Sequence, residues 1–77
     1  MNKQRREALA KQIAPLEEVK SQLDDLLSEE QEYKDNMPES LQNGEKGEAA
    51  DNAISEIESA ISSIEEAISN IENAQGE

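Results

Sequence analysis

Hydrophobic residues in the last third of the chain follow a seven-residue repeat. The segments AISEIES (53–59), AISSIEE (60–66) and AISNIEN (67–73) share the pattern Ala-Ile-Ser-x-Ile-Glu-x. Its isoleucines, spaced alternately three and four residues apart, are Ile54, Ile57, Ile61, Ile64, Ile68 and Ile71. This spacing is typical of the a and d positions of a coiled coil and not of a strand. The repeat therefore predicts a helix over about residues 48–74 that packs on another helix.

The first half of the chain predicts a second long helix, over about residues 2–35. It is rich in good helix formers and carries a stripe of apolar residues: Leu9, Ile13, Leu16, Leu23 and Leu27. Pro15 interrupts this segment, and a proline inside a helix removes a hydrogen bond and clashes with the preceding turn. Because Ile13 and Leu16 keep the stripe's spacing across Pro15, we expect a continuous helix that kinks there. The alternative is a helix that starts at Pro15 after a frayed segment 1–13.

Residues 36–47 predict the turn between the two helices. Helix-breaking residues cluster there, namely Asn36, Pro38, Asn43, Gly44 and Gly47. One short helical turn is expected from Pro38 through Leu41, closing at Gly44. The long helix that carries the isoleucine repeat is expected to begin between residues 43 and 48. The predicted fold is all-α, with residues 1–77 forming a single antiparallel two-helix coiled-coil hairpin. The expected seam pairs are Ile13 with Ile71, Leu16 with Ile68, Leu23 with Ile61 and Leu27 with Ile57, with Lys20 opposite Ile64 and Glu30 opposite Ile54.

The two edges of this hairpin differ in character. On one edge, acidic residues of the two helices are expected to face each other, as in the pairs Glu17 with Glu65 and Asp24 with Glu58. The other edge is apolar and consists of Val19, Leu26, Tyr33, Ala53, Ala60 and Ala67. A lone hairpin needs only its seam, so this apolar row predicts a further contact. The simplest partner is a second copy, which gives a homodimeric four-helix bundle; a different protein partner and solvent-exposed alanines chosen for helix propensity are the alternatives.

Composition narrows the possible functions. The 77 residues carry 19 acidic and 7 basic side chains, a net charge of −12, with neither Cys nor His and one Tyr. Without histidine or cysteine, a histidine base for the serines, thiol chemistry and the Glu-x-x-His metal motif are missing. We therefore expect a non-enzymatic protein with no cofactor and no metal site. No apolar run is long enough for a membrane span, so we expect a cytoplasmic protein that makes no membrane contact.

The negative charge also bears on nucleic acids. It argues against direct binding, because phosphate contacts require a basic surface. An alternative function is an acidic decoy that imitates nucleic acid, as a phage-type inhibitor of a DNA- or RNA-binding protein would. However, a hairpin of about 45 Å with this net charge carries about one charge per 4 Å, against one per about 1.7 Å in duplex DNA. We therefore favour a protein-protein interaction module that self-associates.

The turn and the repeat together resemble a group of small proteins. The segment NMPESLQ (36–42), followed by Gly47-Glu48-Ala49 and the isoleucine heptads, is similar to small uncharacterised acidic helical-hairpin proteins of bacteria and their prophages. The resemblance covers about residues 7–74 and implies the hairpin fold without an activity. Its loop residues Pro38, Glu39, Leu41 and Gln42 are a candidate partner-binding loop. The simpler interpretation is a loop that caps the bundle with Met37 and Leu41.

Overall fold

The computed structural model is a rod built from four helices, and it describes residues 1–76; Glu77 lies outside the described residues. The helices are α1 (Lys3–Ala10), α2 (Ile13–Asp35), α3 (Glu39–Gln42) and α4 (Glu45–Gln75). No strand occurs among residues 1–76. The all-α prediction is therefore confirmed.

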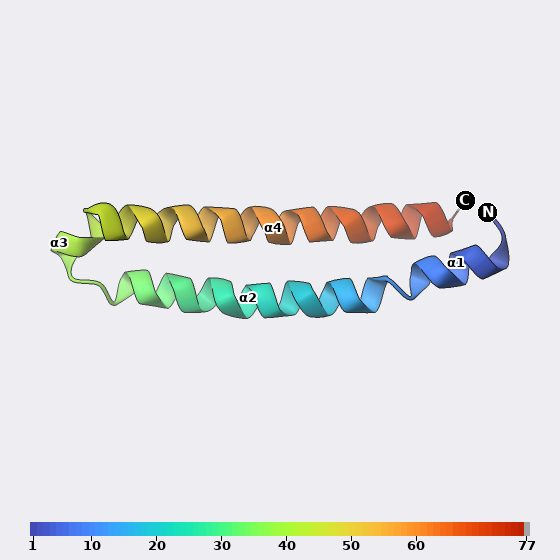
Figure 1. Cartoon of the computed structure of the whole chain (residues 1–77), viewed down its shortest axis with the longest axis horizontal. Coiled ribbons are helices and arrows are strands. Elements are labelled where there is room, and N and C mark those ends of the chain that lie inside the picture. The colour runs from blue at the N-terminus through green and yellow to red at the C-terminus, as the bar shows by residue number, and fades with distance from the viewer. Residues whose placement is uncertain (77) are drawn as a thin grey trace.

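The two long helices lie side by side and run in opposite directions. Figure 1 shows α2 and α4 joined at one end by α3, with both chain termini at the other end. The rod measures 59 × 15 × 12 Å, so its cross-section is little more than one helix pair. The short helix α3 starts directly after Pro38 and ends before Gly44, as the sequence predicted. Helix α4 begins at Glu45, within the stretch 43–48 predicted for its start.

The prediction of a continuous first helix kinked at Pro15 is wrong, because the helix is interrupted at Lys11 and Gln12. Both residues keep right-handed helical dihedral angles, and the Gln12 amide bonds the Leu9 oxygen at 3.0 Å, one residue short of the α-helical partner. The cause is still Pro15, since a proline ring clashes with the carbonyl group four residues before it, which is that of Lys11. Pro15 itself lies in the first turn of α2, where its missing N–H costs nothing.

The segment before the break is also a helix, not a frayed end. The Asn2 side chain caps α1 by accepting a hydrogen bond of 2.8 Å from the Arg5 amide. Beyond the break, α1 leans toward the C-terminal end of α4 (Figure 1). Leu9 is half-buried there, which gives this short helix an apolar contact with the rest of the rod.

The helix pair encloses a thin seam and little core. The seam residues of α1 and α2 are half-buried at the predicted spacing: Leu9, Ile13, Leu16, Lys20, Leu23, Leu27 and Glu30. Among the hydrophobic residues of the described chain, only Met37, Ala50 and Ile61 are buried, and none is fully enclosed. A pair of helices has no third element to close over its seam, so most of the isoleucine repeat stays partly open to water.

Candidate interaction surface

The residues of the predicted apolar edge are largely open to solvent. Val19, Leu26 and Tyr33 are 45%, 51% and 54% exposed. On α4, Ala60 is exposed, while Ala53 and Ala67 are half-buried. We refer to these six residues as the apolar edge.

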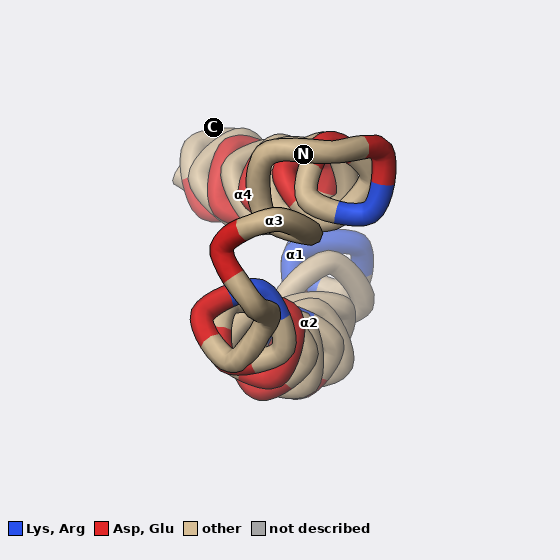
Figure 2. Tube along the Cα trace, turned by 90° about the vertical axis from the view of Figure 1, so that its left-hand side faces the viewer, with Lys and Arg blue, Asp and Glu red and all other residues tan. Residues whose placement is uncertain are grey.

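The seam fixes the side of the rod on which the apolar edge lies. Val19 and Leu26 each directly precede a half-buried seam residue, and Ala60 directly precedes the buried Ile61. In an antiparallel helix pair, such preceding positions of both helices fall on the same flank. In the end-on view of Figure 2 the right-hand side of α2 is largely free of acidic residues, which gather on its left. The apolar edge is thus a narrow strip on one side of the rod, exposed at Val19, Leu26, Tyr33 and Ala60 and partly covered at Ala53 and Ala67.

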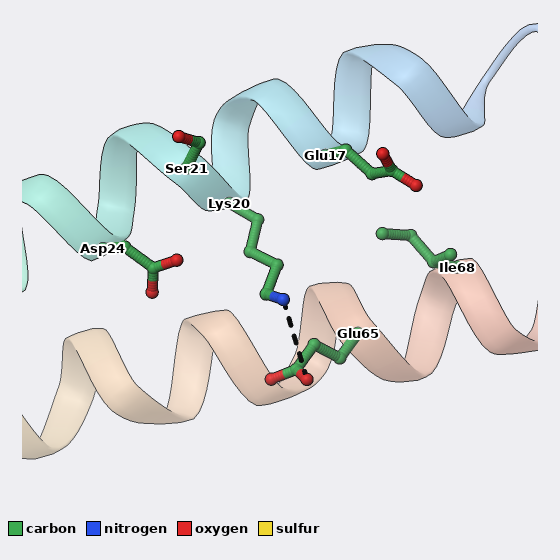
Figure 3. Close-up of a pocket in the computed structure, with 6 residues that line it drawn as sticks. All are labelled: Glu17, Lys20, Ser21, Asp24, Glu65 and Ile68. Carbon is green, nitrogen blue, oxygen red and sulfur yellow. Dashed lines mark ion pairs between the residues drawn. The ribbon is translucent and has the colours of Figure 1, made fainter.

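The opposite edge is acidic, but lysines interrupt it. The Lys20 ammonium lies 3.8 Å from a carboxylate oxygen of Glu65, in a shallow groove lined by Glu17, Ser21, Asp24 and Ile68 (Figure 3). Here Lys20 points across to α4 between Glu17 and Asp24. The expected opposition of Glu17 and Glu65 is therefore relieved by Lys20, which the sequence placed in the seam opposite Ile64.

A second ion pair of the same kind lies two heptads from the first. Lys34 of α2 pairs with Asp51 of α4. Because the two lysines and the two acids are each separated by two heptads, the pairs define the register of the antiparallel helices. All four side chains are at least 30% exposed, and ion pairs at such sites contribute only about 0–1 kcal/mol each. The two ion pairs therefore mark the register of α2 against α4 but contribute little to the free energy of unfolding.

The turn is held by Gln42. Its side-chain amide donates to the main-chain oxygens of Met37 at 3.0 Å, Lys34 at 3.1 Å and, more weakly, Asp35 at 3.4 Å. The Lys34 and Asp35 oxygens belong to the last turn of α2, where helix geometry leaves carbonyl groups without a helical N–H partner. The Lys34 oxygen also accepts from the Met37 amide at 3.1 Å. Gln42, one of the four residues of the candidate partner-binding loop, is thus engaged inside the turn.

The other three residues of that loop lie on the surface. Pro38, Glu39 and Leu41 are exposed, with Leu41 at 41%. Met37 is buried beneath the turn, as the capping interpretation requires, whereas Leu41 is not. The loop therefore divides into an inner part that closes the end of the rod and an outer part that is free for contact.

Sequence reasoning missed the contact that closes this turn. Gly47 is buried, and a Cβ atom there would overlap the main chain of Gln42. The signal is present in the heptad, because continuing the repeat backward from Ile54 places Gly47 and Ala50 at a and d positions. Both are buried, and Gly47 must be small because α3 packs on α4 at this point.

The described residues offer no clear ligand site. Within residues 1–76 no group of three or more acidic side chains is placed to hold a metal ion. In the same part of the chain, none of the helices combines the length and hydrophobicity that a membrane crossing requires. The apolar edge is consequently the main candidate for a functional surface.

Comparison of the chain with protein-family models, with curated proteins and with solved structures found no significant match. The class of the protein is therefore defined by its own architecture, which is an acidic antiparallel helix pair with one apolar and one charged edge.

Proposed function

We propose that this chain is a non-enzymatic protein-protein interaction module that self-associates through its apolar edge, giving a homodimeric four-helix bundle. The observation that carries the proposal is the amount of surface left open. The chain exposes 5670 Å² at a mass of 8.5 kDa. A compact monomer of this mass exposes about 4,700 Å². The excess of about 1,000 Å² is similar to the roughly 800 Å² that each partner loses in a standard interface.

The thin core supports the same proposal. A chain of this size rarely gains more than about 3–5 kcal/mol from its own core and commonly needs a disulfide, a metal or a second subunit. Cysteine is absent from the sequence, so a disulfide is ruled out. A second copy placed on the apolar edge would cover Val19, Leu26 and Tyr33 together with the open side of the isoleucine seam.

The acidic decoy is the weaker alternative. A net charge of −12 along 59 Å corresponds to about one charge per 5 Å, roughly a third of the density of duplex DNA. The pairs of Lys20 with Glu65 and Lys34 with Asp51 also neutralise part of the acidic edge at two places. An unbroken row of acids would suit a decoy better.

Sedimentation equilibrium on two matched variants tests the proposal. Ala60→Glu places a charge in the middle of the apolar edge, and an unpaired charge buried by a close helix contact is strongly destabilising, by several kcal/mol. We expect the wild type to sediment as a dimer and Ala60→Glu as a monomer. Ser62→Glu introduces the same side chain at an exposed position of the outer face, where the expected change is within about 0.5 kcal/mol.

A monomeric wild type, or an Ala60→Glu variant that keeps both the mass and the stability of the wild type, would show that the apolar edge is solvent-exposed in solution. The self-association would then have to be abandoned.

A further inference from the structure

The apolar edge is centred on the middle of the rod. Ala60 is the middle residue of α4, which runs from Glu45 to Gln75. The register set by the two ion pairs places Leu26 within about one residue of the same level. From this level the edge extends by one heptad in each direction, to Val19 with Ala67 and to Tyr33 with Ala53. A second copy turned end over end about this level would overlap the first along the full length of α4.

We propose that the second copy packs on the apolar edge in the reverse direction, so that the turns of the two copies lie at opposite ends of the bundle. This inference rests on the self-association proposed above and adds its geometry. The two-fold axis crosses the rod near Leu26 and Ala60, so that Leu26 faces the partner's Leu26 and Tyr33 faces the partner's Val19. The alanines of the two α4 helices then face each other and let these helices approach more closely than the two α2 helices.

Lys46 provides one independent argument for this orientation. It lies one heptad before Ala53, on the side of the apolar edge, and it is exposed. With the turns at opposite ends, Lys46 reaches the level of the partner's Ala74. The last turn of α4 contains no basic residue of its own, and a cation near a helix C-terminus is stabilising. Each copy thus supplies the charge that the end of the other copy's α4 lacks.

Acidic residues beside the apolar edge give a second argument. Glu29 and Glu56 are exposed and flank the edge in the half of the rod nearer the turn. With both turns at the same end, Glu29 would lie beside the partner's Glu56, and the symmetry would repeat this repulsion. With the turns at opposite ends, Glu29 faces the partner's Gln22 and Glu56 faces the partner's Ser63. The same-end arrangement would set large side chains against alanine, but it brings these like charges together.

The basic end of the rod agrees with this choice. The exposed bases Lys3, Arg5, Arg6 and Lys11 lie in or next to α1. With the turns at opposite ends, this segment comes close to the partner's turn, which carries the exposed acids Glu39, Glu45 and Glu48. The same-end arrangement would instead crowd two basic segments and two acidic turns.

Distances between spin labels distinguish the two orientations in the full-length protein. The chain contains no native cysteine, so Gln4→Cys and Asn43→Cys, both at exposed positions, each take a single nitroxide. In dimers labelled only at Gln4→Cys, we expect an intermolecular distance approaching the 59 Å length of the rod. Mixed dimers of the two labelled variants should give a much shorter distance.

The possible results separate this inference from the proposed function. A short distance between the two labels in dimers labelled only at Gln4→Cys would overturn the opposed orientation and leave self-association intact. A monomer in sedimentation equilibrium would overturn both. Lys46→Gln provides a further check, because two equivalent helix-end contacts are lost and the dimer should weaken roughly 3- to 10-fold. Lys46→Arg keeps the charge and should keep the affinity; wild-type affinity in Lys46→Gln would contradict the arrangement.

Discussion

Gly47 packs so closely on the main chain of Gln42 that a Cβ atom at position 47 would overlap the Gln42 carbonyl group. The backbone fixes the position of a Cβ atom, and the Gln42 carbonyl group is itself backbone, so neither can rotate away. Alanine normally stabilises a helix relative to glycine by up to about 1 kcal/mol. At Gly47 we expect the reverse, a loss of about 1–3 kcal/mol, because overpacking forces α3 away from α4. Urea unfolding followed by circular dichroism measures the difference.

Gly44 is the matched control for this substitution. It is the N-cap of α4, has extended dihedral angles and lacks a side-chain cap, and a Cβ atom there would lie at an ordinary 3.5 Å from the Ser40 oxygen. Gly44→Ser should therefore leave stability unchanged or raise it slightly. If Gly47→Ala were as stable as Gly44→Ser, the close packing of α3 on α4 would be wrong.

The capping role of Gln42 leads to a second prediction. Gln42→Glu replaces the donating amide with a carboxylate that faces the oxygens of Met37 and Lys34. The Met37 and Lys34 oxygens then lose the Gln42 donor, and only the Lys34 oxygen keeps another, the Met37 amide. We expect a loss of about 1–3 kcal/mol in the free energy of unfolding. Gln12→Glu is the control, since the amide of Gln12 makes a single exposed hydrogen bond of 3.3 Å to the Ala8 oxygen. Equal stability of the two variants would argue against the cap.

A feature of this turn could be predicted from the sequence where neighbouring residues determine it. It could not be predicted where it depends on residues that meet only after the chain has folded. The position of α3 followed from Pro38 and Gly44, because proline and glycine set the backbone where they stand. The inward direction of Gln42 did not follow, since it depends on the carbonyl groups of α2, which come close only after the chain has folded back. For the same reason, the sequence groups Gln42 with Pro38, Glu39 and Leu41 in the candidate partner-binding loop.

The long helices show the same division. The alternating spacing of isoleucines is a property of the helix itself, so the seam and its register could be predicted. The pairing of Lys20 with Glu65 could not, because a long lysine side chain chooses among several nearby acids according to their arrangement in space. The apolar edge was predicted from the heptad, but its partner lies outside a single chain and stays a proposal.

Lys20 gives a third prediction, because it occupies a seam position while 34% of its side chain remains exposed. Lys20→Leu should raise the free energy of unfolding by about 1–2 kcal/mol, since apolar burial in the seam outweighs a largely solvated ion pair. Glu65→Gln removes only the partner of Lys20 and should change stability by less than about 1 kcal/mol. Urea unfolding at one fixed protein concentration compares the variants. A marked loss of stability in Lys20→Leu would show that the ion pair is a major support of the fold.

The net charge of −12 gives a fourth prediction. Salt screens repulsion among exposed charges, and the Debye length falls to about 8 Å near 0.15 M ionic strength. Repulsion among the excess acidic side chains outweighs the attraction within the two lysine ion pairs. The melting temperature should therefore rise as sodium chloride increases from low to physiological concentration. A Lys20→Gln, Lys34→Gln double variant lacks these pairs and should show a steeper rise. A melting temperature that falls with salt in the wild type would mean that attractive pairs dominate.

Pro15 provides the last prediction, which concerns the break between α1 and α2. In Pro15→Ala the residue at position 15 regains an N–H that can bond the Lys11 oxygen, and the ring that clashes with that oxygen is gone. We expect residues 3–35 to form one continuous helix, in which the amides of residues 12 and 15 bond the oxygens four residues before them and exchange slowly by NMR. The alternative cause of the break is the attraction of Leu9 to α4, which bends α1 inward. If the break persists in Pro15→Ala and closes in Leu9→Ala, packing rather than the proline ring determines where the helix stops.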